Sequence, residues 1–392
     1  MKDIILKKIL SLNNYKLNNS AIYIHIPFCD HKCIYCDFYS IITTDNIQSF
    51  LSALKKEISY YSSSYNSDRN ISSVFFGGGT PSLMEPDYID EILSCLKRNF
   101  NIYKDAEITL ETNPGTVDKE KLKAFKNTGI NRISIGIQSF DENELKFLTR
   151  IHDSQTAINT VYDAAEAGFN NISIDLIFNL PDQTKERWKN NLETAIELPI
   201  KHLSAYSLIL EKGTILNKMV LDGKVTIQDE DYDADLYETT IEFLASKGFY
   251  QYEVSNFAKP GYECLHNNAY WKYKDYLGFG PSAHSFVQNK RWWNFTSLKK
   301  YISEVYQKNN ALMNFEILDD TQQHEEYVML ALRSSGLNLN EYKNRFSDDW
   351  ITKNNQYLIK LSEENYLQMD QLKIKLTPKG YAVCDEILKN IL

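Results

Sequence analysis

The sequence lacks an excess of basic residues: 43 lysines and arginines stand against 52 aspartates and glutamates, and the formal net charge is −9. Nucleic-acid binding depends largely on neutralising phosphates with basic side chains, so this balance argues against such a partner. The sequence also lacks a run of about 20 apolar residues, the length that a membrane-spanning helix needs. We therefore expect no nucleic-acid partner and at most transient contact with a membrane.

Cysteine is scarce, and half of the six cysteines stand alone, at Cys95, Cys264 and Cys384. This spacing differs from the dense framework of a disulfide-stabilised secreted domain. Residues 1–20 are basic and partly apolar without a cleavage-site pattern, and we interpret them as a short N-terminal appendage. The expectation is a cytoplasmic protein with reduced thiols.

The other three cysteines lie within eight residues, in the stretch "YIHIPFCDHKCIYCDFYS". Cys29, Cys33 and Cys36 have the spacing C-x3-C-x2-C, with no fourth cysteine nearby. Thiolates are soft ligands that favour zinc or iron–sulfur centres. Structural zinc takes four protein ligands, so His25 or His31 would have to complete a zinc site. A cubane cluster held by three thiolates instead keeps one iron open to an external ligand.

Short strand-like runs alternate with helical patterns over the first two thirds of the chain. The strands are predicted at 21–26, 71–76, 107–111, 132–137, 171–177 and 202–209, and the helices near 45–61, 86–98, 118–128, 154–167, 184–197 and 230–247. Six strand-then-helix units predict an α/β fold with a parallel sheet that curls into a partial, six-unit βα barrel.

Alternation within these strands predicts an unusual barrel interior. Ile133, Ile135 and Ile137 share one face of their strand, opposite Ser134, Gly136 and, just beyond, Gln138. The other strands place His25, Glu107, Thr109, Glu111, Ser173 and Asp175 on the same polar side. An ordinary closed barrel fills its interior with branched apolar side chains. Because unpartnered polar groups are costly to bury, we expect a partly open barrel that holds a polar cofactor and solvent.

The run "FFGGGTPSL" follows the second predicted strand. Its three glycines allow unusual backbone conformations and expose amides to a polar ligand. Taken alone, such a run fits a tight strand-to-helix turn equally well. Its position at the same strand ends as the cysteine loop favours binding.

The alternation of predicted strands and helices stops near residue 300. The remaining sequence reads as a helix that ends near Gly336, followed by another helix, a short hairpin and a terminal helix. This pattern predicts a C-terminal winged-helix-like α+β module. We divide the chain into an appendage (1–20), a core barrel (21–250), an aromatic-rich region (251–305) and the C-terminal module (306–392).

The cysteine motif, "GGGTP", "ETNP", "GIQSF" and "DLIFNLPDQT" together resemble the radical S-adenosylmethionine superfamily. The resemblance continues through "RIHD", "YEVSNFAKPGY", "HNNAYW" and "LTPKG". Over this length the chain is most similar to the HemW group of haem chaperones, which is related to oxygen-independent coproporphyrinogen III oxidase. The resemblance implies a 4Fe-4S cluster on the three cysteines, with S-adenosylmethionine on the open iron. One departure is Asn179, where the family usually has glycine.

The resemblance also implies which residues contact S-adenosylmethionine. Tyr23 matches a position beside the cofactor, and Gly78, Gly79 and Thr80 match the stretch near its methionyl amine and carboxylate. Further cofactor positions are Glu111, Gln138, Arg150 and Asp175. Three of these, Glu111, Gln138 and Asp175, belong to the polar set that strand alternation turns inward.

Two features separate haem carriage from porphyrinogen oxidation. The oxidase has a cysteine two positions after the third cluster ligand, where this chain has Phe38, as HemW-type sequences do. The "HNNAYW" stretch resembles a haem-binding motif and implies His266 as an axial ligand, with Cys264 as an alternative. Residues 262–295 contain ten aromatic residues in 34, whereas the whole chain is 13% aromatic. The resemblance therefore implies a chaperone that passes haem to haemoproteins such as those of a respiratory chain, with radical decarboxylation of coproporphyrinogen as the alternative.

Overall fold

A computed structural model describes residues 19–65, 69–346 and 349–392. Most of the N-terminal appendage predicted for residues 1–20 lies outside the described residues. Its last two residues, Asn19 and Ser20, belong to the first strand rather than to an appendage.

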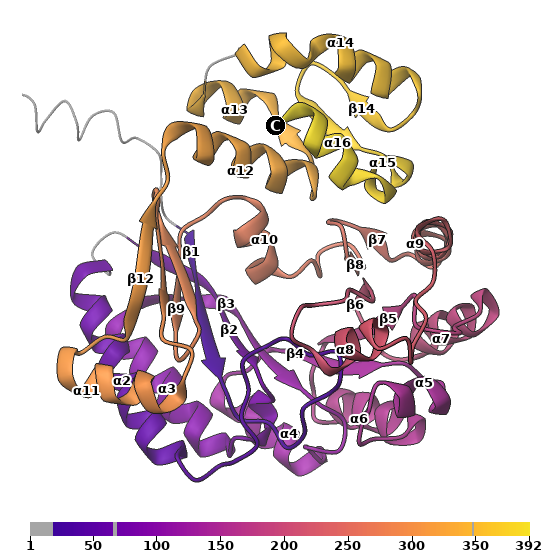
Figure 1. Cartoon of the computed structure of the whole chain (residues 1–392). Helices are drawn as coiled ribbons and strands as arrows, with labels where there is room; N and C mark the ends of the chain where they lie inside the picture. Colours follow the sequence, from indigo (N-terminus) through magenta and orange to yellow (C-terminus); the bar gives the residue numbers. More distant parts are fainter. Residues whose placement is uncertain (1–18, 66–68, 347–348) are drawn as a thin grey trace, which may run out of the picture.

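Six parallel strands form the centre of a large sheet, and the chain adds them in spatial order. They are β1 (Asn19–Ile26), β2 (Asn70–Gly78), β3 (Asn101–Thr112), β4 (Arg132–Gln138), β5 (Asn171–Phe178) and β6 (His202–Ser207). The helices that follow them are α2 (Ile47–Tyr65), α3 (Pro86–Asn99), α4 (Lys119–Thr128), α6 (Ser154–Glu166), α7 (Lys185–Glu197) and α9 (Glu230–Ser246). The predicted α/β fold with a parallel sheet is confirmed (Figure 1).

Local sequence explains where these helices begin. The N-cap side chains of Asp118, Asp153, Thr184 and Asp229 each accept a hydrogen bond from a backbone N–H in the first turn. Such caps satisfy donors that the helix itself leaves free. The isoleucines of β4 are fully buried in the main core with the apolar faces of the helices, so strand alternation separates an apolar outer face from a polar inner one.

Shorter strands extend this sheet at both edges. On the β6 side lie β8 (Asn256–Ala258) and β7 (Tyr250–Gln251), and both pairings are antiparallel. On the β1 side, β9 (Tyr276–Phe279) pairs parallel to β1 and is followed by the antiparallel strands β10 (His284–Val287), β11 (Lys290–Asn294) and β12 (Leu312–Ile317). The described part of the sheet thus has twelve strands, with β12 and β7 at its open edges.

The extra strands change the domain division that the sequence suggests. Residues 251–305 do not stand apart from the barrel, because β8 to β11 continue its sheet. The strand β12 also belongs to that sheet, although the sequence places the C-terminal module from residue 306 onward. We therefore propose that the boundary lies between β12 and the next helix, α12 (Asp320–Leu332). Four short helices complete the larger unit: α5 (Glu142–Phe147), α8 (Ile215–Leu221), α10 (Leu265–Trp271) and α11 (Leu298–Lys308).

The C-terminal module has its own core and its own sheet, in the order β13-β15-β14. After α12 come β13 (Leu337–Asn338), α13 (Leu339–Arg345), α14 (Asp349–Glu363), β14 (Leu367–Met369), β15 (Lys373–Leu376), α15 (Pro378–Ala382) and α16 (Cys384–Ile391). This order of helices and a small three-stranded sheet is winged-helix-like. The module lies above the barrel on the side of α10 (Figure 1). Among the described residues, none of the helices combines the length and apolar character needed to span a bilayer.

Candidate cofactor site and the neighbouring cavity

The three clustered cysteines lie on the loop that follows β1. Its base is closed by two backbone bonds, from Cys29 N to Ile41 O at 3.0 Å and from Ile41 N to Pro27 O at 2.8 Å. All three cysteines are free and partly exposed, so their thiols are accessible to a metal. Burial raises the pKa of Cys36 above its ordinary value, so the Cys36 thiolate gains stability from a positively charged partner.

The glycine run after β2 packs directly against this loop. Backbone N–H groups of Gly79 and Thr80 donate to Ile26 O at 2.8 Å and Phe28 O at 2.7 Å. Gly78 has a φ of +116°, and a Cβ on Gly79 would lie 2.5 Å from Phe28 O. A side chain at Gly79 would therefore collide with the cysteine loop, which explains why glycine occupies this close approach.

The cysteine loop and the inner strand ends enclose a cavity of about 370 Å³. Ten of the twelve residues that the sequence predicts for the site line it: Cys29, Cys33, Cys36, Gly78, Gly79, Thr80, Glu111, Gln138, Arg150 and Asp175. We call this space the cluster cavity. Its walls come from β2, β3, β4, β5 and β6. Among the ten predicted residues, the fold brings together positions as far apart as Cys29 and Asp175.

Two carboxyl groups give the cluster cavity an affinity for cations. Burial and the neighbouring Asp175 raise the pKa of Glu111 to about 8, although its Oε2 accepts a 3.2 Å bond from Gly78 N. Burial also raises the pKa of Asp175, whose Oδ1 accepts a 3.4 Å bond from Ser134 Oγ. A positively charged ligand between them would favour their ionised forms.

Arg150 supplies positive charge at the cysteine end of the same cavity. Its Nη2 donates to Asn113 Oδ1 at 2.9 Å and to Gly136 O at 2.7 Å, and its Nη1 donates to Cys33 Sγ at 3.5 Å. Its buried Nε has no partner within the described residues. Gln138 follows a bulge in β4 and has a φ of +74°, a conformation that non-glycine residues adopt mainly where the surroundings enforce it.

The side chains of the cluster cavity fit an iron–sulfur cluster together with a ligand that carries both a carboxylate and positively charged groups. Within the described residues, no three His, Cys, Asp or Glu side chains converge on the position of a single metal ion. A closed zinc site needs four such ligands at one point, whereas cluster thiolates each bind a different iron. The Arg150 Nε and the two carboxyls match the carboxylate and the positive groups of S-adenosylmethionine.

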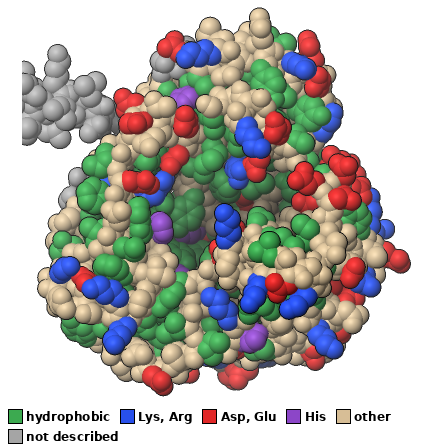
Figure 2. Space-filling model, viewed as in Figure 1, with side chains coloured by type: hydrophobic (Ala, Val, Ile, Leu, Met, Phe, Trp, Pro, Cys, Tyr) green, Lys and Arg blue, Asp and Glu red, His purple; other side chains and the backbone are tan. Residues whose placement is uncertain are grey.

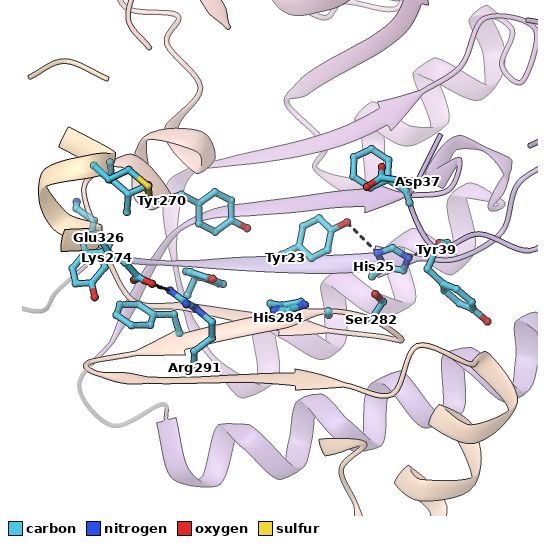
Figure 3. A pocket seen from close by; sticks show the side chains of 17 residues that line it. Tyr23, His25, Asp37, Tyr39, Tyr270, Lys274, Ser282, His284, Arg291 and Glu326 are labelled. Atoms are coloured by element: carbon cyan, nitrogen blue, oxygen red, sulfur yellow. Dashed lines mark hydrogen bonds and ion pairs between the residues drawn. The ribbon is translucent and has the colours of Figure 1, made fainter. Parts of the chain in front are cut away.

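The two remaining predicted residues, Tyr23 and His266, lie elsewhere. Tyr23 lines a second cavity of about 710 Å³, which meets the cluster cavity at Asp37 and Phe38. We call it the aromatic cavity. Its walls come from β1, α10, β9, β10, β11 and α12 (Figure 3). Figure 2 shows a hollow between the C-terminal module and the barrel on this face of the molecule.

His266 is only 1% exposed and lines neither cavity. Its Nδ1 lies 3.1 Å from Ser73 Oγ and its Nε2 lies 2.9 Å from Tyr270 OH. Burial lowers its pKa to about 3, so the ring is neutral. The alternative ligand, Cys264, is fully buried and lies 3.4 Å from Glu107 Oε1. Neither residue presents a free atom to a cavity, so each would have to lose a bond to reach haem iron.

The aromatic residues of 262–295 do not form one wall. Tyr270, Tyr273, Tyr276 and Phe286 line the aromatic cavity. By contrast, Phe279 and Trp292 lie on the helix-covered side of the sheet, where both contact Tyr61. Composition alone cannot separate the two faces, because the strands β9 to β11 are too short to give a clear alternation of apolar and polar residues.

Several lining residues escape the sequence analysis. Asn113 binds Arg150, and Tyr35 and Tyr206 close the cluster cavity. The motif "ETNP" contains Asn113 and was the available signal for it. Asn179, which stands where the family usually has glycine, has a φ of +61°, a left-handed conformation that asparagine tolerates.

An open parallel sheet with three loop cysteines after β1 and a glycine turn after β2 defines a radical S-adenosylmethionine protein. The family described as the Radical SAM superfamily matches residues 23–195. Membership of this superfamily implies a 4Fe-4S cluster and S-adenosylmethionine.

Similar proteins show which family within this superfamily the chain belongs to. The chain is 34% identical to "Heme chaperone HemW" of Bacillus subtilis over 80% of this chain and 83% of the relative. It is 39% identical to "Heme chaperone HemW" of Escherichia coli over 69% of this chain and 71% of the relative. A solved coproporphyrinogen III oxidase (HemN) from Escherichia coli has a TM-score of 0.82 and 25% identity over 98% of this chain and 92% of that one. The chain belongs to the HemW family.

Proposed function

We propose that this protein is a haem chaperone, which binds haem beside a 4Fe-4S cluster and S-adenosylmethionine and transfers haem to acceptor haemoproteins. The observation that carries the proposal is Phe38, which stands where the oxidase has a further cysteine. Phe38 is 63% exposed and lies on the wall that the cluster cavity and the aromatic cavity share. The family membership supports the same proposal, because the relatives in the comparisons are called haem chaperones.

In this proposal Cys29, Cys33 and Cys36 hold the cluster. Gly78, Gly79 and Thr80 line the cavity beside the cluster cysteines, where their backbone lies against the methionyl part of S-adenosylmethionine. Together the bound cluster and S-adenosylmethionine supply one-electron chemistry when a reductant is present.

The side chains of the cluster cavity orient the cofactor. Glu111 and Asp175 attract its positive groups, because their buried carboxyls have raised pKa values that a nearby cation relieves. Arg150 offers the carboxylate its Nε, which has no partner in the described part of the chain, and Gln138 offers an amide from the bulged end of β4. Tyr23 lies in the adjacent cavity, where we propose that it contacts the part of the cofactor that reaches the shared wall.

The partners follow from the same role. We propose haem itself, and acceptor haemoproteins such as those of a respiratory chain, with no nucleic acid and only transient membrane contact if any. The acidic net charge of −9 and the predicted reduced thiols are consistent with a cytoplasmic protein that meets its acceptors by protein–protein contact.

Parallel anaerobic incubations of the cluster-loaded protein with haem and with coproporphyrinogen III test the proposal. The protein should bind haem in a defined stoichiometry and leave the porphyrinogen intact in the presence of S-adenosylmethionine and a reductant. Release of carbon dioxide from coproporphyrinogen III, with no haem bound, would establish the oxidase instead. That alternative is worth testing because the solved oxidase shares the fold over nearly the whole chain.

A further inference from the structure

The histidines of this chain differ in whether their ring nitrogens are available. All seven lie in the described residues, and six have at least one ring nitrogen in a hydrogen bond: His25, His31, His152, His202, His266 and His324. The exception is His284, for which neither ring nitrogen has a hydrogen-bond partner within the part of the chain that is described. An imidazole with a free nitrogen is the form that binds a metal.

His284 stands on β10, is exposed, and lines the aromatic cavity. Its ring stacks on Trp293 with centroids 5.6 Å apart and an angle of 19° between the planes, which fixes the ring orientation without occupying either nitrogen. In Figure 3 it lies between Arg291 and Ser282, with Tyr23 on the neighbouring part of the cavity wall. Partial burial and the charge of Arg291 lower its pKa, which favours the neutral ring.

A glycine on the neighbouring strand allows β10, which carries His284, to pack closely. The strand β9 separates β10 from β1, and its Gly278 pairs with Tyr23. Gly278 therefore adds no side chain at the level of Tyr23, and a Cβ there would lie 2.1 Å from His284 O. Glycine at this position therefore lets the backbone of β10 pack closely on β9, so that His284 and Tyr23 line the same cavity.

The rest of the aromatic cavity suits a planar apolar ring that carries carboxylates. Tyr270, Tyr276 and Phe286 contribute aromatic surface, and Met329 and Leu330 of α12 add aliphatic surface. The volume of about 710 Å³ falls within the range of roughly 300–1,000 Å³ that ligand pockets occupy. Lys274 lines the cavity near Arg291, and its ammonium group has no ion pair among the described residues (Figure 3).

We propose that haem binds in the aromatic cavity with a ring nitrogen of His284 as axial ligand and its carboxylates toward Lys274. This inference rests on the proposed chaperone function. The neutral imidazole donates a lone pair to the iron and keeps its proton on the other nitrogen, so the step needs no oxidant or reductant. The position beside Phe38 places the cargo next to the cluster cavity.

His266 then acts as a positioning residue. Its Nε2 bond holds Tyr270 OH at 2.9 Å, and Tyr270 forms part of the cavity wall. The ring of His266 also stacks on Phe75, with centroids 5.0 Å apart. The "HNNAYW" motif thus positions one wall of the haem site, and in this proposal His284, not His266, binds the iron.

Electron paramagnetic resonance of the cluster-loaded protein with ferric protoporphyrin IX tests this inference, because the spectrum of ferric haem reports its axial ligand. The parent should show histidine ligation. The variant His284→Ala should lose that signal, bind haem about tenfold or more weakly, and regain histidine-like ligation on addition of imidazole. Lys274→Ala should weaken binding without changing the ligand signal.

Two further histidine variants supply the controls. The variant His324→Gln alters a histidine of α12 that does not line the cavity, and it should keep the parental spectrum. The variant His266→Gln should weaken binding yet preserve histidine ligation. Loss of the histidine signal in His266→Gln together with its retention in His284→Ala would overturn this inference and leave the chaperone function standing. A parent protein that binds no haem at all would overturn both.

Discussion

Replacement of Glu111 by glutamine should change how S-adenosylmethionine binding depends on pH. Burial and Asp175 raise the pKa of Glu111 from 4.5 to about 8 in the ligand-free protein. In neutral solution the carboxyl therefore keeps its proton. A cationic ligand beside it lowers this pKa again, so binding displaces a proton from Glu111.

The size of the effect follows from proton linkage. Displacement of one proton strengthens binding by up to about tenfold for each pH unit below a pKa of about 8. Between about pH 6 and about pH 8 the parent should gain up to roughly 100-fold in affinity from Glu111 alone. Glutamine has a similar shape but cannot ionise, so Glu111→Gln removes this contribution.

Equilibrium dialysis of labelled S-adenosylmethionine against cluster-loaded protein, repeated at several pH values, measures how the logarithm of the affinity changes with pH. The slope is compared between the parent and Glu111→Gln. A proton that the ligand's own amino group would release on binding would be the same in parent and variant. The difference between the two slopes therefore isolates Glu111 and should approach about one decade per pH unit. Parallel slopes would show that Glu111 does not face the cofactor, and the assignment of the inner strand face would fail with it.

Three other substitutions test the cluster and the framework around it. Conversion of Cys29, Cys33 and Cys36 together to serine should abolish iron and sulfide binding after anaerobic reconstitution. The far-ultraviolet circular dichroism should persist, because the fold does not depend on these thiols. Stoichiometric zinc without iron in the native protein would contradict the iron–sulfur cluster. Burial raises the pKa of Glu57 from 4.5 to about 7. The free energy of unfolding should therefore fall by about 3 kcal/mol as pH rises from about 4.5 to about 7. Denaturant titrations at several pH values should show that Glu57→Gln removes most of this pH dependence. The fully buried Trp188 donates to Thr240 Oγ1 at 2.7 Å, and Trp188→Ala should lower the free energy of unfolding by about 3–5 kcal/mol; a loss below about 1 kcal/mol would mean that α7 packs differently.

The central strands and helices could be predicted because their signals are local. Each strand of the barrel alternates apolar and polar residues, and most of the helices that follow begin with a capping side chain. The same alternation predicts from the sequence alone that Glu111, Gln138 and Asp175 face inward, and all three line the cluster cavity. Their convergence with the cysteine loop follows from the rule that parallel strands present their carboxyl ends at one edge.

The region after residue 250 could not be predicted in the same way. The strands β9 to β11 are four or five residues long, and their place depends on pairing with distant segments, such as Ala21 with Tyr276. His266 shows the same limit, since its partner Ser73 lies 193 positions away. A motif indicates that His266 matters, but only the fold shows that both of its ring nitrogens are bonded, whereas those of His284 have no hydrogen-bond partner among the described residues.

Transfer of haem tests the central claim most directly. The cluster-loaded protein, charged with one equivalent of haem, is mixed with the haem-free form of a respiratory haemoprotein, and the acceptor is then separated and its haem spectrum recorded. The account predicts that haem moves to the acceptor faster than it moves to an unrelated haem-scavenging protein at the same concentration, and that the parent produces no carbon dioxide from coproporphyrinogen III. Equal rates to both recipients would show passive release of haem and would contradict the chaperone function.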